Sequence, residues 1–221
     1  MAIRTISVDD ALYEYMMEVS LRETDVMRRL REETYRLSSR DLASAPEQSQ
    51  FLALLMKLVD AKRAIEVGIY TGYTTLAMAY ALPEDGRLLA CDVSDEYTSL
   101  ARRYWQEAGM AERIDLRLAP ALETLTALAE DPAQHGAYDL MYIDADKPNN
   151  MAYFELGLKL LRTGGLIVID NIFLSGSVID HTQQGDGVVA IREMNKQLLD
   201  DQRVDLSVVP IGDGMTLAYK R

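Results

Sequence analysis

The chain has 221 residues, of which 48% are hydrophobic, a size that suits one sizeable α/β domain and is short for two. The net charge of −12 argues against a nucleic-acid partner, because a phosphate backbone would be repelled. No apolar run approaches the roughly 20 residues of a membrane helix, so no membrane partner is expected. The single cysteine, Cys91, excludes a disulfide framework and a cysteine-rich zinc site, and the N-terminus lacks a signal-peptide layout, which fits a cytoplasmic protein.

Residues 1–60 are expected to form helices. Leu12–Val19 and Asp25–Leu37 are rich in helix formers and carry their charges on one face. A third helix is expected to begin within Ser44–Glu47, where a serine precedes Pro46 by two residues and an acid follows. We therefore predict a single domain over residues 1–221, with a helical part up to residue 60 and a sheet core from residue 61.

From residue 61 onward, short apolar runs alternate with longer helical stretches. The predicted strands are Ala64–Val67, Leu88–Asp92, Ile114–Leu118, Leu140–Asp144, Leu166–Asp170, Val204–Val209 and Thr216–Lys220. Helical stretches between them include Thr74–Ala81, Glu96–Ala108 and Ala121–Ala129. This alternation predicts right-handed βαβ units and an α/β fold with helices on both faces of a mostly parallel sheet. Only Ile211–Met215 separates the last two strands, which predicts an antiparallel hairpin turned at Asp213-Gly214.

The segment after the first predicted strand has the features of a ligand-binding turn. It reads Glu66-Val67-Gly68-Ile69-Tyr70-Thr71-Gly72-Tyr73-Thr74, and ligands of open α/β sheets bind beyond the carboxyl ends of the strands. Its glycines allow a sharp turn, and the helix from Thr74 would direct backbone amides toward an anion such as a carboxylate. The spacing is not the dinucleotide fingerprint. Taken alone, the same glycines are equally consistent with a structural turn.

An acid, Asp92, ends the second predicted strand. It can accept both hydroxyls of a ribose, although it can also cap the helix that follows at Ser94. Ala119-Pro120-Ala121, after the third strand, suits the face of an adenine or a plain turn into a helix. The loop and the acid together favour a nucleoside ligand that carries a carboxylate, and S-adenosylmethionine is such a ligand.

Hard oxygen ligands follow the next two predicted strands, with Asp144 after one and Asp170 and Asn171 after the other. These strands should be neighbours, so the three side chains are expected to converge and to suit Mg²⁺ or another divalent cation. Carboxylates brought together repel unless a cation lies between them. Neither His135 nor His181 follows a strand near this cluster, which disfavours zinc. The alternative is that these residues merely cap strands that face solvent.

Lys147, three residues beyond Asp144, is a candidate general base, because an ammonium beside a dication gives up its proton more readily. The alternative is a surface lysine paired with Asp146, which could itself bind the amino end of S-adenosylmethionine. We hypothesise that two adjacent phenolic oxygens chelate the metal, Lys147 takes one proton, and the phenolate attacks the sulfonium methyl. Holding the two reactants together would supply most of the acceleration.

At these residues the chain resembles the caffeoyl-CoA and catechol O-methyltransferase family, particularly its bacterial members. The resemblance covers roughly residues 10–220, and the matching segments are Ala45–Gln48, Glu66–Thr74, Ala90–Asp92, Tyr104-Trp105, Asp144–Lys147, Gly164–Leu166, Asp170-Asn171 and Ile211–Gly214. It implies a Rossmann-like methyltransferase fold with seven strands and an antiparallel last strand. It also implies a small phenolic acceptor and a homodimer.

The resemblance further implies a role for individual residues. Asp144, Asp170 and Asn171 correspond to the metal ligands, and Lys147 corresponds to the catalytic lysine. The positions expected at S-adenosylmethionine are Ser44, Glu66, Gly68, Ile69, Gly72, Thr74, Asp92, Ala121 and Asp146.

The chain also departs from the family. Phe173-Leu174 replaces a Leu-Trp pair near the acceptor, and the longer N-terminal arm that serves CoA in plant members has no clear equivalent, so a free phenol is expected. Residues 172–187 are expected to form a mobile flap over the acceptor. Three alternatives stay open. They are a nicotinamide-dependent oxidoreductase without its fingerprint, a non-catalytic module that binds S-adenosylmethionine, and a methyltransferase for a non-catechol secondary-metabolite hydroxyl.

Overall fold

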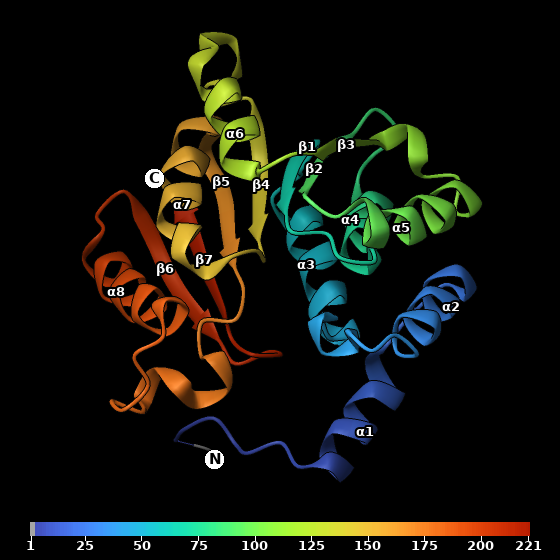
Figure 1. The fold of residues 1–221 in the computed structure, drawn as a ribbon, viewed down its shortest axis with the longest axis horizontal. Coiled ribbons are helices and arrows are strands. Elements are labelled where there is room, and N and C mark those ends of the chain that lie inside the picture. Colours follow the sequence, from blue (N-terminus) through green and yellow to red (C-terminus); the bar gives the residue numbers. More distant parts are fainter. Residues whose placement is uncertain (1–2) are drawn as a thin grey trace.

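A seven-stranded sheet runs through the centre of the computed structural model, which describes residues 3–221 (Figure 1). Its strands are β1 Arg63–Val67, β2 Arg87–Asp92, β3 Ile114–Leu118, β4 Tyr138–Ile143, β5 Leu161–Ile169, β6 Val204–Val209 and β7 Met215–Lys220. The strand order is β3-β2-β1-β4-β5-β7-β6, and β7 alone runs in the direction opposite to the other six strands. The predicted α/β fold with a mostly parallel sheet is confirmed.

Helices precede the sheet and connect its strands. The α-helices are α1 Asp10–Ser20, α2 Asp25–Thr34, α3 Pro46–Leu58, α4 Tyr73–Ala81, α5 Asp95–Glu107, α6 Ala121–Glu130, α7 Asn150–Leu160 and α8 Asp186–Asp200. Short 3-10 helices are η1 Arg40–Leu42, η2 Ala111–Arg113, η3 Pro132–Gln134, η4 Lys147–Asn149 and η5 Leu174–Ile179. Thr24 and Ser94 cap the N-termini of α2 and α5, because their hydroxyls accept hydrogen bonds from free backbone amides of the first turn. Within residues 3–221, no helix has both the length and the apolar character to cross a bilayer.

The central strands are buried on both faces because alternate side chains enter two separate layers of helices. Ile65 and Met141 pack with α6, α7 and α8 on one face. Ala64 and Leu140 pack with α3 and α4 on the other face. A further cluster around Trp105 joins α2, α4 and α5. The short apolar runs without polar alternation are therefore explained by burial on both sides.

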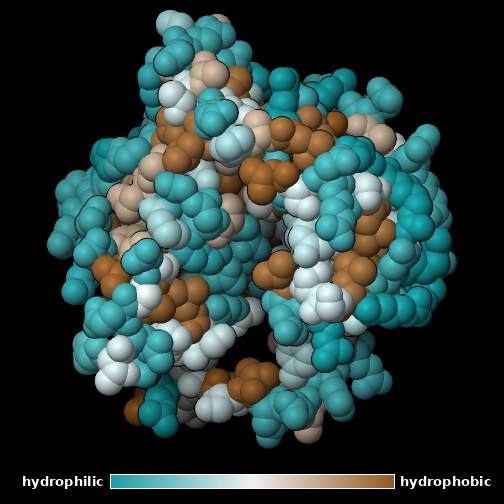
Figure 2. Space-filling model, in the orientation of Figure 1, coloured by the Kyte–Doolittle hydropathy of each residue, from teal (hydrophilic) through white to brown (hydrophobic). Residues whose placement is uncertain are grey.

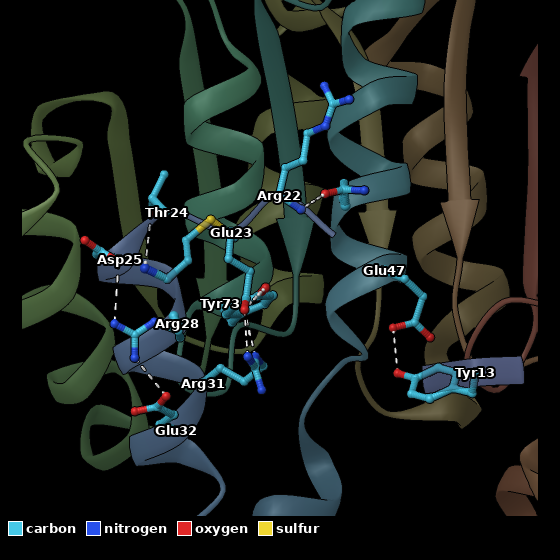
Figure 3. Close-up of polar contacts among 12 residues, drawn as sticks. Tyr13, Arg22, Glu23, Thr24, Asp25, Arg28, Arg31, Glu32, Glu47 and Tyr73 are labelled. Carbon is cyan, nitrogen blue, oxygen red and sulfur yellow. Dashed lines mark hydrogen bonds and ion pairs between the residues drawn. The ribbon is translucent and has the colours of Figure 1, made fainter. Parts of the chain in front are cut away.

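The N-terminal helices are tied to the sheet core by polar contacts (Figure 3). Glu23, just before α2, accepts hydrogen bonds from Nε and Nη2 of Arg31 at 2.7 and 2.6 Å, and from the hydroxyl of Tyr73 at 2.6 Å. Tyr13 of α1 donates to Glu47 of α3 at 2.9 Å. The structure describes every residue of α1, and none of them is buried. Its exposed large apolar residues are Leu12, Tyr15 and Val19. The expected homodimer, to which this face would be available, stays a prediction.

Several predicted boundaries were wrong by one to five residues, and the largest error is at the start of β5, which begins at Leu161 rather than Leu166. Helix α2 ends at Thr34 rather than Leu37, because the chain continues in a turn in which the amide of Leu37 donates to the carbonyl of Thr34. Strands β4 and β5 end one residue before Asp144 and Asp170, so both acids begin loops. The ends of helices and strands are hard to predict from a local pattern, because frayed ends depend on tertiary contacts.

The C-terminal hairpin forms as predicted between β6 and β7, with two differences. Its turn is centred on Gly212-Asp213, one residue earlier than predicted, and the amide of Gly214 donates to the carbonyl of Ile211 at 2.9 Å. Strand β7 inserts between β5 and β6, so β6 forms the edge of the sheet. The loop after β5 therefore lies next to the turn of the hairpin, where the amide of Phe173 donates to the carbonyl of Asp213.

Candidate functional site

The strand order reverses between β1 and β4, and polar residues gather at this switch point. Strands β2 and β3 lie on one side of β1, while β4 and β5 lie on the other. The last residues of β1, β4 and β5 are in register, as are those of β1 and β2 near their ends. The residues at or just beyond these ends therefore share one edge, and they include Gly68, Asp92, Asp144 and Asp170. Open α/β sheets bind ligands at this position.

A cavity of about 910 Å³ opens at this edge. Figure 2 shows a hollow near the middle of the face drawn, between the part that carries α7 and the part that carries α4. Its volume suits a nucleoside ligand together with a small second ligand. The predicted site residues that line it are Ser44, Glu66, Gly68, Ile69, Thr74, Asp92, Ala121, Asp144, Asp146, Lys147, Asp170 and Asn171.

Gly68 joins the end of β1 to the loop after β4 at very close range. Its amide donates to the carbonyl of Cys91 at 2.9 Å, and the amide of Asp144 donates to the carbonyl of Val67 at 2.8 Å. Its φ is +89°, and a Cβ atom there would overlap the carbonyl oxygen of Asp144 and lie 2.7 Å from the carbonyl carbon. Only glycine fits this position, and it sets the spacing between the first loop and Asp144.

Gly72, which was expected at the cofactor, does not line the cavity. It precedes α4 with φ +79°, and a Cβ atom there would lie 2.6 Å from the Cβ of Ala101 and 2.8 Å from Nε1 of Trp105. Its carbonyl accepts a hydrogen bond from that nitrogen at 3.2 Å. In this structure Gly72 allows α5 to pack closely against the start of α4.

Asp92 fixes the first loop by accepting backbone hydrogen bonds. Its Oδ2 accepts from the amides of Ile69 at 2.8 Å and Tyr70 at 3.0 Å. Its Oδ1 accepts from the amide of Ser94 at 2.8 Å, next to the start of α5. Asp92 thus serves the helix start and also lines the cavity, so the two roles considered from the sequence are compatible.

Glu66 is a carboxyl group with no solvent exposure, located at the end of β1. Among the described residues, neither of its oxygens has a hydrogen-bond partner, although the hydroxyl of Thr75 lies near. Burial, and then the charges of Asp144 and Asp92, raise the pKa of Glu66 well above its ordinary value. A buried polar group without a partner is costly, so this carboxyl is suited to a ligand in the cavity.

The starts of α3 and α4 place two further hydroxyls near the cavity. Ser49 of α3 shares a hydrogen bond of 2.9 Å with Thr74 of α4, which is buried and lines the cavity. Helix α3 begins at Pro46 with Ala45 in the capping position, so Ser44 does not cap it. Ser44 lines the cavity instead.

Lys147, at the start of η4, holds two of the predicted ligand side chains. Its Nζ donates to Oδ1 of Asn171 at 2.6 Å and lies 3.3 Å from Oδ1 of Asp144. All three side chains line the cavity. Asn171 adopts a positive φ of 56°, which turns the chain sharply after β5. Asp144 and Asn171, which follow β4 and β5, therefore contact the same side chain.

Asp170 is 1% exposed and is held by residues that sequence reasoning missed. Its Oδ2 accepts hydrogen bonds from Nε2 of Gln48 at 2.5 Å and from the hydroxyl of Tyr142 at 2.7 Å. Burial, and then the charge of Asp144, raise the pKa of Asp170 above its ordinary value. A buried carboxyl group beside a second carboxylate favours a compensating cation.

Asp146 does not pair with Lys147, which was the alternative considered for that lysine. One of its carboxylate oxygens accepts from the hydroxyl of Tyr153 at 2.7 Å, and the other accepts from the side-chain amide of Asn149. Tyr153 belongs to α7, so the carboxylate is oriented from outside its own loop. Asp146 is exposed and lines the cavity.

The residues present fit a divalent cation. Within residues 3–221 no group of three histidine, cysteine or acidic side chains is placed to hold a metal, so a cation here would need Asn171 as an amide ligand beside two carboxylates. The ammonium of Lys147 already lies against Asp144 and Asn171, which shows that this corner accommodates positive charge. Carboxylate and amide oxygens are the ligands that hard cations such as Mg²⁺ prefer.

Comparisons with known proteins agree with this geometry. Residues 17–221 match the sequence model of a family described as O-methyltransferase. The chain is 40% identical to mouse catechol O-methyltransferase domain-containing protein 1, over 96% of this chain and 80% of that protein. It is 38% identical to caffeoyl-CoA O-methyltransferase 2 of Eucalyptus globulus, over 98% of this chain and 91% of the relative.

A solved structure gives the same result at the level of the fold. The O-methyltransferase TomG of Streptomyces achromogenes, determined in complex with S-adenosylmethionine, superposes with a TM-score of 0.85 at 29% identity. The match covers 95% of this chain and 96% of that one. Sequence and fold agree over almost the whole length of the chain, which therefore belongs to the S-adenosylmethionine-dependent O-methyltransferase family of the caffeoyl-CoA and catechol type.

Proposed function

We propose that this O-methyltransferase transfers the methyl group to a hydroxyl of a small vicinal diphenol, with a divalent cation bound beside Lys147. The observation that carries the proposal is the cluster of Asp144, Asp170, Asn171 and Lys147 at one end of the cavity. Two adjacent phenolic oxygens are suited to such a site because they can bind a cation together. The mouse and Eucalyptus relatives, named for catechol and for caffeoyl-CoA, support an acceptor of this chemistry.

We assign the other end of the cavity to S-adenosylmethionine. Asp92 would accept the ribose hydroxyls with the lone pairs that its backbone contacts leave free. Ala121 would contact the adenine, and Ser44, Gly68, Ile69 and Thr74 would surround the methionine portion near the start of α4. The unpartnered carboxyl of Glu66 and the exposed carboxylate of Asp146 are the candidates for the amino group.

Asp144, Asp170 and Asn171 would hold the cation, which would supply a positive charge that makes the phenolic hydroxyl more acidic. Beside this charge the Lys147 ammonium would lose a proton to solvent more readily, and the neutral Nζ, released from the contacts it makes here, would then accept the phenolic proton. The phenolate oxygen attacks the methyl carbon of the sulfonium, a carbon–oxygen bond forms, and the carbon–sulfur bond breaks to leave S-adenosylhomocysteine. Because charge is neutralised in this step, the buried walls around Glu66 and Asp170 assist it by excluding water.

The substitution Asp144→Asn tests the cation assignment. It keeps the size of the side chain but removes one charge from the proposed ligand set, so we expect Mn²⁺ affinity to fall by at least about tenfold and methyl transfer to fall with it. Mn²⁺ binding is measured by electron paramagnetic resonance, without any need for turnover.

Asp115→Asn is the matched control, because Asp115 pairs with Arg117 at the surface and lies outside the cavity. We expect it to leave Mn²⁺ binding unchanged, since exposed ion pairs contribute little. Unchanged Mn²⁺ affinity and unchanged methyl transfer in Asp144→Asn would contradict the proposed function.

A further inference from the structure

The chain after β5 forms one wall of the cavity at the end that holds Lys147. Asn171 and Ser175 line the cavity there, and Asp213 of the C-terminal hairpin lies beside them. The segment then continues through η5 and reaches α8 at Asp186. The cofactor end, at Asp92, is built from other strands. The position of residues 172–185 therefore bears on the acceptor end of the cavity.

Three consecutive residues of this segment have positive φ angles, a backbone conformation that needs support from the surroundings. Leu174 and Ser175 have positive φ values of 46° and 51°, and Gly176 follows with 87°. Non-glycine residues are strained in this region and persist only where the surroundings determine them. The restraint must come from contacts with other elements.

The hairpin turn restrains the first half of the segment. Oδ1 of Asp213 accepts from the amide of Ser175 at 2.7 Å, and the amide of Phe173 donates to the carbonyl of Asp213 at 3.1 Å. The ring of Phe173 lies where a Cβ atom on Gly214 would be, so the two loops interlock. These contacts hold residues 173–175 from the side of β7.

One side chain of α8 restrains the second half. The guanidinium of Arg192 donates from Nε to the carbonyl of Val178, from Nη1 to that of Gln183 and from Nη2 to that of Ser177, each at 2.8 Å. Nη2 also donates to the carbonyl of Asp180. A planar fork of donors can satisfy carbonyls that converge from several directions, whereas a lysine ammonium is a single point of charge.

We propose that Arg192 is a positioning residue for the acceptor, which acts by fixing residues 172–185 against the cavity while touching neither the acceptor nor S-adenosylmethionine. The proposal rests on the proposed function in one respect, since it takes the acceptor to bind at the Lys147 end. The strained residues 174–176 join the two restrained halves, so loss of the Arg192 contacts leaves the wall at Ser175 held by Asp213 alone.

The test compares Arg192→Met and Arg192→Lys with the unsubstituted enzyme. Methionine keeps most of the apolar stem, and lysine keeps the charge without the fork, so the lysine variant preserves the fold if methionine does not. The control is Lys196→Met, a change at an exposed position one turn further along α8. The acceptor is protocatechuate, a vicinal diphenol whose two hydroxyls give different methylated products.

We expect both Arg192 variants to raise the KM for protocatechuate by about tenfold. The ratio of the two methylated products should also move closer to unity, by about threefold or more. The Kd for S-adenosylmethionine should change less than about twofold, because its end of the cavity is unaltered. Amide hydrogen exchange should accelerate in residues 173–185 and nowhere else. A change in product ratio reports acceptor orientation, which a merely structural role for Arg192 would not move.

Faster exchange with an unchanged product ratio and KM would overturn the inference, because the segment would then not contact the acceptor. A loss of S-adenosylmethionine affinity that parallels the change in KM would also overturn it, because the effect would be global. Product from the unsubstituted enzyme is measured first, so an unchanged variant counts against Arg192 alone. If the unsubstituted enzyme methylates no diphenol, the proposed function and this inference both fall.

Discussion

Replacing Lys147 by methionine is expected to lower kcat by about 10²- to 10⁴-fold, the range measured for loss of a general base. The same change should raise Mn²⁺ affinity at least about tenfold, because the ammonium competes with a cation for the same oxygens. Its Nζ donates to Asn171 at 2.6 Å and lies 3.3 Å from a carboxylate oxygen of Asp144. Opposite effects on turnover and on cation affinity distinguish a base at this site from a metal ligand.

Two further variants sharpen this experiment. Lys147→Arg keeps the positive charge but cannot release a proton near neutral pH, so it should be as inactive as Lys147→Met. Lys159→Met changes an exposed lysine of α7 and should behave like the unsubstituted enzyme. Kinetics at saturating S-adenosylmethionine and titration with Mn²⁺ provide the two readouts. Restored turnover in Lys147→Arg would reduce Lys147 to an electrostatic role.

The second large effect is expected at Gly68. The substitution Gly68→Ala should lower the free energy of unfolding by about 2–4 kcal/mol, since a side chain at positive φ meets a rigid backbone. The new Cβ atom would overlap the carbonyl of Asp144, and the hydrogen bonds between β1, β2 and β4 resist the shift that would relieve it. Any shift moves the first loop against Asp144, so S-adenosylmethionine binding should weaken severely as well.

Gly109→Ala is the matched control for this prediction. Gly109 also has a positive φ, 69°, but a Cβ atom there meets nothing within 4 Å. The substitution Gly109→Ala should therefore lower the free energy of unfolding only by the conformational penalty, about 1–2 kcal/mol. It should leave the affinity for S-adenosylmethionine unchanged. Urea unfolding and calorimetric titration with S-adenosylmethionine measure both quantities. Equal destabilisation by the two substitutions would show that the contact with Asp144 carries no energetic weight.

Much of the site could be predicted because the ends of buried strands are visible in a sequence. Asp92, Asp144 and Asp170 each follow an apolar run, and in a parallel sheet the carboxyl ends of such runs meet at one edge. The short link before Met215 likewise left no room for a crossover helix, so the antiparallel hairpin followed from length alone. Both predictions depend on patterns that span a few residues.

The parts that were missed depend on contacts between distant segments. Gln48 contacts Asp170 across 122 positions, and no local pattern around Gln48 indicates a partner so far along the chain. The spacing of Gly68 and Gly72 could not separate a cavity glycine from a packing glycine, because that distinction requires Trp105 on α5. The insertion of β7 between β5 and β6 is a pairing choice with no local pattern.

The loop after β5 illustrates the same point for function. Its weak periodicity predicted a flap, yet the structure gives it a 3-10 helix and restraints from Asp213 and Arg192. Its mobility stays a prediction, as do the homodimer and the cytoplasmic location. The hydrogen-exchange experiment on Arg192 addresses that mobility directly, because it compares the restrained and the released segment.

The most direct test of the central claim is product formation from a panel of vicinal diphenols and their matching monophenols. Each is incubated with S-adenosylmethionine and enzyme, once with Mg²⁺ and once after treatment with EDTA. We predict methylated product from diphenols with Mg²⁺, because the cavity holds the cluster of Asp144, Asp170, Asn171 and Lys147. We predict no product from monophenols and no product after treatment with EDTA. Full activity in EDTA, or no product from any diphenol, would contradict it.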